Sequence, residues 1–140
     1  MVSARLFLCS VLLPLAGCGE AEHGFVPVRG VVLLEGKPLA TGFVSYRPDP
    51  AKGNASLHVP TGIISAEGRY ELFTIGEPGA PPGWYRVLVF ADQNQIQGAV
   101  HPLPPQWMTN VKYTREETTD LSVCVAADAA ADAYHLSLAK

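Results

Sequence analysis

The sequence predicts an all-β domain, built as a two-sheet Greek-key sandwich of about seven short strands. Glycine and proline contribute 13 and 12 of the 140 residues, whereas charged residues make up only 16%. This balance is typical of a turn-rich β protein rather than a charged helical bundle. Short apolar segments alternate with turn residues, and no stretch shows a convincing helical period. We therefore expect short strands joined by tight turns and loops.

The first eighteen residues have the pattern of a targeting segment. Arg5 supplies a positive charge, and the apolar run 6–16 that follows is shorter than the roughly 20 residues that span a bilayer. Residues 15–18, Leu-Ala-Gly-Cys, resemble the bacterial lipobox. The resemblance implies that Cys18 takes a diacylglyceryl group and that the signal peptide 1–17 is then cleaved. Plain secretion with a chance cysteine is the alternative.

Cleavage would leave two regions, a lipidated N-terminus and tether over 18–27 and a sandwich domain over 28–140. The thiolate of Cys18 is the one good nucleophile near the cleavage position. Two or more acyl chains hold a protein stably on a bilayer, whereas one chain holds it only marginally. Cys9 would leave with the signal peptide, so an acylated Cys18 leaves Cys124 without an intrachain disulfide partner.

The first half of the domain holds four expected strands. Val44 and Tyr46 share one face of the second strand, and Tyr70 and Leu72 are expected to face inward from the fourth. The third and fourth strands should form a hairpin, because Gly68 can adopt the positive φ that the turn requires. The four strands cover residues 28–34, 42–47, 62–65 and 69–74.

The second half holds three more expected strands, at 84–91, 120–125 and 134–139. The first of them is apolar on both faces, which predicts a central position in its sheet. In the next, alternation places Val123 and Val125 inward, so Cys124 should face outward or lie at a sheet edge. A small apolar filler with an inert thiol is the alternative for this cysteine. The other side chains expected to face inward are Tyr85, Val87, Val89 and Leu121.

Five sequence blocks resemble, in order, those of carboxypeptidase-regulatory-like, transthyretin-like domains in short bacterial lipoproteins. The resemblance covers most of residues 28–125 and implies a transthyretin-like, Ig-like sandwich. It identifies a fold more than an activity. The blocks are Val-Arg-Gly-Val-Val at 28–32, Leu-Glu-Gly-Lys-Pro-Leu at 34–39, Val-Ser-Tyr-Arg-Pro at 44–48, Gly-Arg-Tyr-Glu-Leu at 68–72 and Pro-Gly-Trp-Tyr-Arg-Val-Leu-Val at 82–89.

Catalytic motifs are absent from the sequence. It contains no Gly-x-Ser-x-Gly, no phosphate-binding glycine loop and no His-Glu-x-x-His. Transthyretin-like hydrolases of hydroxyisourate end in Tyr-Arg-Gly-Ser, a motif that the end of this chain lacks. We therefore expect no enzyme activity, no cofactor and no metal site. The histidines, which lack the spacing of metal ligands, are His23, His58, His101 and His135.

The expected function is that of a lipid-anchored cell-envelope lipoprotein whose non-catalytic sandwich binds a protein or a glycan. A formal net charge of -3 and the lack of a Lys/Arg cluster argue against a nucleic-acid partner. Gly19 follows the cysteine, and by resemblance to the sorting rules of two-membrane bacteria this favours the outer membrane. The alternatives are a purely structural envelope accessory and an unrecognised hydrolase.

The candidate binding surface lies in residues 92–113, a segment longer than a sandwich connection normally requires. Trp107 is its expected anchor, because aromatic side chains dominate binding hot spots. Leu103 and Tyr113 supply further apolar groups. In the alternative interpretation, Leu103 and Trp107 tuck under the sandwich edge and only cover it.

Overall fold

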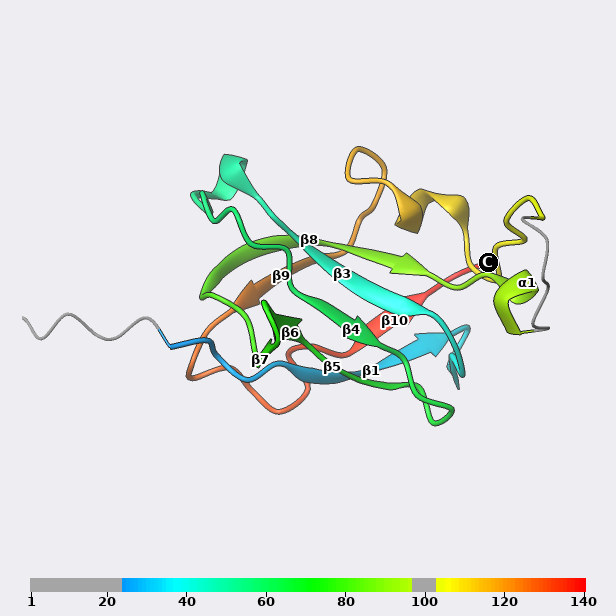
Figure 1. Ribbon diagram of the computed structural model, residues 1–140, viewed down its shortest axis with the longest axis horizontal. Helices are drawn as coiled ribbons and strands as arrows, with labels where there is room; N and C mark the ends of the chain where they lie inside the picture. Colours follow the sequence, from blue (N-terminus) through cyan, green and yellow to red (C-terminus); the bar gives the residue numbers. More distant parts are fainter. Residues whose placement is uncertain (1–23, 97–102) are drawn as a thin grey trace, which may run out of the picture.

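The computed structural model describes residues 24–96 and 103–140, and within them the chain forms ten strands in two sheets (Figure 1). The expectation of an all-β, two-sheet fold is confirmed. The helical segments are α1 (Gln93–Ile96) and the 3₁₀ turns η1 (Pro50–Lys52) and η2 (Val111–Thr114). None of the helices in the described part of the chain has the length and apolar character needed to cross a bilayer. The expected signal peptide and Cys18 lie outside the described residues.

The smaller sheet has four strands and is organised around β1. Strand β10 pairs parallel to β1 with Val32 opposite Leu136, while β5 and β2 pair antiparallel to successive parts of β1. Glu35 and Gly36 form the tight turn into β2 with φ of 50° and 82°. The strands are β1 (Arg29–Leu34), β2 (Lys37–Pro38), β5 (Arg69–Glu71) and β10 (Leu136–Leu138).

The larger sheet has six strands in the order β7-β6-β4-β3-β8-β9. Strand β8 lies between β3 and β9, which confirms the central position expected from its two apolar faces. The strands are β3 (Phe43–Pro48), β4 (Thr61–Ile63), β6 (Phe73–Thr74), β7 (Glu77–Pro78), β8 (Gly83–Phe90) and β9 (Ser122–Val125).

The expected single strand 69–74 is wrong, because the structure divides it into two strands that belong to different sheets. The turn before it forms as expected, with Gly68 at φ 78° and its N–H donating to the Ser65 carbonyl at 2.9 Å. After the turn, however, β5 pairs with β1, and β6 pairs with β4. The change occurs at fully buried Leu72, whose N–H donates to the Val28 carbonyl at 3.0 Å. Residue alternation runs unbroken through this crossing, so the pattern alone predicts one strand.

The core lies between the two sheets and contains the residues that alternation placed inward, apart from Leu121, which packs against the core partly buried. Val44 and Tyr46 on β3 are fully buried, as are Tyr85, Val87 and Val89 on β8. The hydroxyl of Tyr85 donates to the Pro81 carbonyl at 2.7 Å, so this ring is buried with its polar atom satisfied.

Cys124 is half-buried on β9, the last strand of the larger sheet. It pairs with Trp84 of β8, on the face opposite to buried Val123 and Val125. The expectation that Cys124 faces outward or lies at a sheet edge is confirmed, because β9 is an edge strand.

Two buried tyrosines connect the sheets through a chain of hydrogen bonds. The Tyr70 hydroxyl on β5 donates to the Tyr134 carbonyl at 2.5 Å, and it therefore accepts from the Tyr46 hydroxyl on β3 at 2.8 Å. Burial raises the pKa of Tyr46 and of Tyr70 well above the ordinary tyrosine value. The folded state therefore holds these hydroxyl protons more tightly than the unfolded state does. The stability that results is complete below the unfolded pKa of about 10 and declines as the pH rises above it.

Removing the Tyr70 hydroxyl is expected to destabilise the domain more than removing the Tyr46 hydroxyl. Tyr70→Phe leaves both the Tyr46 hydroxyl and the Tyr134 carbonyl without this partner, a loss of about 1–3 kcal/mol. Tyr46→Phe leaves the Tyr70–Tyr134 bond in place and should cost roughly 0.5–1.5 kcal/mol. Urea unfolding of the two variants measures the difference. Equal losses would contradict the donor order given above.

Candidate functional site

Of the three residues expected to form a binding surface, one is buried and the other two differ in exposure. Tyr113 belongs to the core, with 3% of its surface exposed and its hydroxyl accepting from the Ala139 N–H at 3.1 Å. Trp107 is half-buried, and its ring packs on Phe90 with the centroids 6.1 Å apart. Leu103 is exposed. The structure therefore removes Tyr113 from the expected surface and leaves Trp107 and Leu103 in different environments.

Trp107 also takes part in backbone pairing at the end of β8. It forms an isolated antiparallel bridge with Asp92, and the neighbouring Met108 N–H donates to the Ala91 carbonyl at 2.9 Å. The Asp92 carboxylate accepts from the Gln106 N–H at 2.9 Å. These contacts favour the covering role for Trp107 over the binding role, the two roles that the sequence leaves open.

A cavity of about 540 Å³ adjoins Trp107, and Thr109 lines it. Thr109 is buried, and its hydroxyl has no hydrogen-bond partner among the described residues. The remaining lining residues are Leu34, Gln93, Met108 and Lys140. Apart from Lys140, no charged side chain of the described residues lines this cavity.

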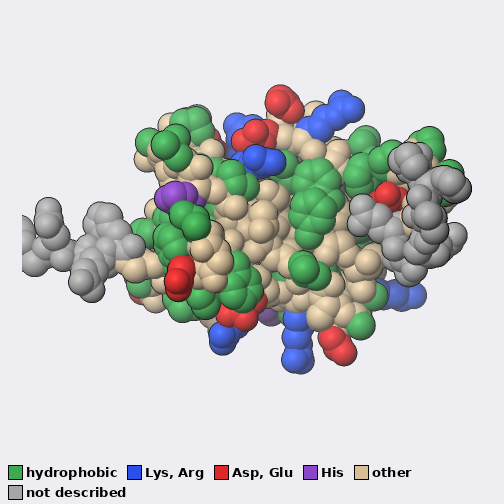
Figure 2. Space-filling model, viewed as in Figure 1, with side chains coloured by type: hydrophobic (Ala, Val, Ile, Leu, Met, Phe, Trp, Pro, Cys, Tyr) green, Lys and Arg blue, Asp and Glu red, His purple; other side chains and the backbone are tan. Residues whose placement is uncertain are grey.

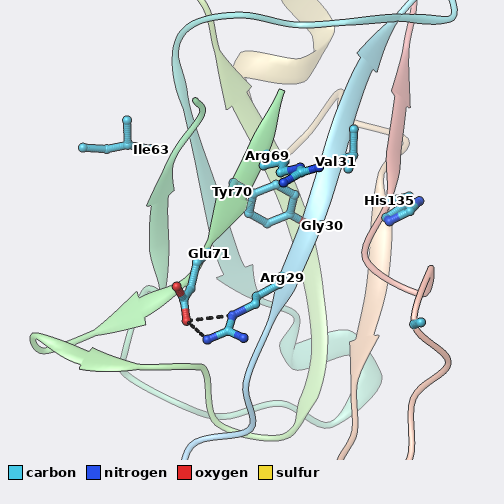
Figure 3. Close-up of a pocket in the computed structure, with 9 residues that line it drawn as sticks. Arg29, Gly30, Val31, Ile63, Arg69, Tyr70, Glu71 and His135 are labelled. Carbon is cyan, nitrogen blue, oxygen red and sulfur yellow. Dashed lines mark hydrogen bonds and ion pairs between the residues drawn. The ribbon is translucent and has the colours of Figure 1, made fainter. Parts of the chain in front are cut away.

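A second pocket, which we call the arginine pocket, lies on the outer face of the β5-β1 pair and has a volume of about 460 Å³ (Figure 3). Strand alternation explains its composition, because Tyr70 and Gly30 face the core at the position where they pair. Their neighbours on the two strands therefore face outward, with Arg29 opposite Glu71 and Val31 opposite Arg69. The pocket residues used below are Arg29, Val31, Arg69, Glu71 and His135.

Glycine at position 30 lets the segment that contains Tyr134 and His135 approach β1 and form the third side of the arginine pocket. A Cβ on Gly30 would overlap the Tyr134 carbonyl oxygen and lie 2.8 Å from the Tyr70 ring. Without that Cβ, the segment before β10 packs directly against β1 and brings His135 to the pocket. Figure 3 shows His135 on the side of β1 away from Arg69 and Glu71.

The two arginines of the pocket differ in their bonding. The Arg29 Nε and one terminal nitrogen both donate to the same oxygen of Glu71, at 3.0 and 2.9 Å. The Arg69 guanidinium makes no ion pair or side-chain hydrogen bond with the described residues. Two guanidiniums and one carboxylate leave an excess of positive charge when His135 is neutral, and Arg69 carries it.

The chemistry of the arginine pocket suits the binding of an anion. Among the described residues that line it, the one carboxylate is already engaged by Arg29, and none is a serine, threonine, cysteine or lysine that could act as a nucleophile. A planar guanidinium matches the geometry of a carboxylate or phosphate with two parallel hydrogen bonds. Val31, Ile63 and Ala131 add apolar surface around it.

Sequence reasoning did not identify the arginine pocket. Its charged residues come from three segments far apart in the chain, and His135 on its own carries no motif. The available signal was the outward position of Arg29, Arg69 and Glu71 in two strands, which becomes informative only once β5 is known to pair with β1.

The described residues contain no further candidate site built from histidines. His58 packs edge-on to the Phe25 ring, and His23 and His101 lie outside the described residues. Within residues 24–96 and 103–140, no group of three or more His, Cys, Asp and Glu side chains is arranged to hold a metal ion.

Comparisons with known proteins returned no match among family models, curated proteins or solved structures.

The contacts of Trp107 make its covering role testable. Trp107→Ala removes the ring that packs on Phe90 and should lower the melting temperature by about 4 °C or more, since roughly 1 kcal/mol has an effect of this size in a small domain. Leu103→Ala, at an exposed neighbour in the same segment, should leave it unchanged. Differential scanning fluorimetry compares the two variants. An unaltered melting temperature for Trp107→Ala would restore Trp107 as a binding residue.

Proposed function

We propose that this chain is a lipid-anchored envelope protein whose β-sandwich binds an acidic group of a protein or glycan and does not catalyse a reaction. The observation that carries the binding role is the Arg69 guanidinium. It has no side-chain partner among the described residues, and it lies in a pocket with a second arginine, a histidine and apolar surface. The shared recognition chemistry is a carboxylate, supplied either by an acidic peptide or by an acidic sugar.

The Arg29–Glu71 pair supports this role by holding one wall of the pocket in place. Both bonds converge on one Glu71 oxygen, so the pair ties β1 to β5 across their outer face. The pair is partly exposed and should add little to stability. The role of the pair is to neutralise Glu71, whose free carboxylate would otherwise repel the ligand.

The proposed anchor rests on the sequence before the domain. The lipobox-like residues 15–18 follow a short apolar run, and Cys18 stands six residues before Gly24, where the described chain begins. Anchoring to the outer membrane is the localisation we propose. We also propose that the two sheets follow the Greek-key connection of transthyretin-like sandwiches, which the five family-like blocks support.

The acid-binding role is tested with the detergent-solubilised full chain and two probes, an oligoglutamate peptide and a polygalacturonate oligomer. Arg69→Gln should weaken binding of the recognised probe about 10- to 100-fold, because a hydrogen bond to a charged group contributes roughly 1.5–3 kcal/mol. Isothermal titration calorimetry provides the affinities. The probe that binds distinguishes a peptide from a sugar as the source of the carboxylate.

The matched control is Arg115→Gln, because Arg115 is an exposed arginine that does not line the arginine pocket. It should leave the affinity unchanged. Equal losses from the two substitutions would reduce the effect to net charge and count against the pocket. Failure of both probes to bind would favour the purely structural accessory.

The anchor is tested by Cys18→Ser in the full chain. Without the thiol no acyl chain can be attached, so the protein should move from the detergent-requiring membrane fraction to the soluble fraction. Cell fractionation followed by a high-salt wash measures this. A Cys18→Ser protein that stays with washed membranes would contradict the lipid anchor.

A further inference from the structure

Three apolar side chains are exposed near the point where the described chain begins. Leu57 is 94% exposed, Ile75 is 76% exposed and Val59 is 37% exposed. We call these three residues the apolar end patch. Single exposed apolar residues are ordinary on protein surfaces, whereas a group at one end of a domain indicates a contact surface.

Phe25, the second described residue, lies close to both segments that carry the apolar end patch. The Phe25 ring meets His58, which stands between Leu57 and Val59, with the ring centroids 6.5 Å apart. Gly79 also lies close to Phe25, because a Cβ added to Gly79 would lie 3.1 Å from the Phe25 Cβ.

The β6-β7 hairpin has its base at Gly79, next to Phe25, and carries Ile75 of the apolar end patch. The hairpin is closed at its base by the Gly79 N–H, which donates to the Leu72 carbonyl at 2.7 Å, and Ile75 lies in its turn. Figure 1 places β6 and β7 in the same half of the molecule as the start of the described chain, and Figure 2 shows hydrophobic side chains gathered at that end.

Ile75 is unfavourable at its position on two counts. Its φ is 51°, in the left-handed region that a β-branched side chain rarely adopts. Its side chain is also mostly in water, so no packing within the described fold compensates for this conformation. Glycine, asparagine or aspartate is the usual residue at such a turn position. The isoleucine is better explained by a contact outside the domain.

The length of chain before the domain restricts what that contact can be. Six residues reach at most roughly 20 Å when fully extended, so an acylated Cys18 would keep Gly24 within that distance of the bilayer. The flanking segments 54–60 and 72–80 contain no lysine or arginine, and their only acidic residue is Glu77. Attraction to the membrane at this end would therefore be apolar rather than electrostatic.

We propose that the apolar end patch inserts into the interfacial layer of the membrane that carries the anchor. Leu57 and Ile75 enter between the headgroups, while Glu77 stays at headgroup level. The inference rests on the lipid anchor proposed above. It adds a second attachment, which gives the domain one preferred orientation on the bilayer in place of free rotation on its tether.

The test places a fluorescent probe at the patch in the full, lipidated chain. Ile75→Cys or Leu57→Cys, each combined with Cys124→Ser, is labelled with an environment-sensitive dye and reconstituted into phosphatidylcholine vesicles. Nitroxide-bearing lipids should quench the dye at both positions. The matched control is Val111→Cys, because Val111 is a half-exposed apolar residue on η2. The residue that caps η2, Asn110, donates its N–H to the Ala139 carbonyl just after β10. The dye at position 111 should not be quenched.

A coupled variant checks that insertion depends on the patch rather than on the dye. Leu57→Asp should remove the quenching at position 75, because a carboxylate at position 57 opposes insertion of this end of the domain into the membrane. High salt should leave the quenching unchanged, since no basic side chain takes part. Positions 57 and 75 both lie outside the core, so circular dichroism should report an unaltered fold for this variant.

Each remaining outcome would overturn the proposal in a distinguishable way. Vesicles that float with the protein but leave position 75 unquenched would overturn the patch while the lipid anchor stands. A chain that fails to float would overturn both. Quenching at position 111 as strong as at position 75 would mean no preferred orientation. A dye at position 75 already shielded from water in the soluble Cys18→Ser protein, without detergent or lipid, would show that a second copy or another protein covers the patch.

Discussion

The buried Tyr70 hydroxyl joins three segments that are distant in the chain. It accepts from Tyr46 of the larger sheet and donates to the backbone of Tyr134, which leads into β10 of the smaller sheet. Each of these groups would lose hydrogen bonds to water on burial, so their mutual pairing keeps the two sheets in one relative position.

The arginine pocket depends on the same tyrosine. With Tyr70 turned into the core, strand alternation turns Arg69 and Glu71 to the outer face, opposite Val31 and Arg29 of β1. Gly30 sits across from Tyr70 and leaves room for the Tyr134 backbone, which in turn brings His135 to the pocket. A packing requirement on the inner face thus determines which charges gather on the outer face.

The proposed anchor, patch and pocket describe a domain that works close to a membrane surface. Cys18 stands only six positions before Gly24, which allows little separation of the domain from the bilayer. A ligand that carries carboxylates would then be bound within the envelope near the lipid headgroups. Binding by one unpaired guanidinium in an open pocket suits a reversible contact, because each hydrogen bond there competes with water.

The sequence by itself determined the class of fold, most strand positions and the inward faces. Alternation identified Tyr85, Val87 and Val89 as core residues, because period-two burial is a local property of each strand. The tertiary structure decided strand partners, since the sheet crossing at Leu72 leaves alternation unbroken. It also decided that Tyr113 is buried and that Arg29, Arg69 and His135 share a pocket. Such neighbours are set by contacts between distant segments, about which local pattern carries no information.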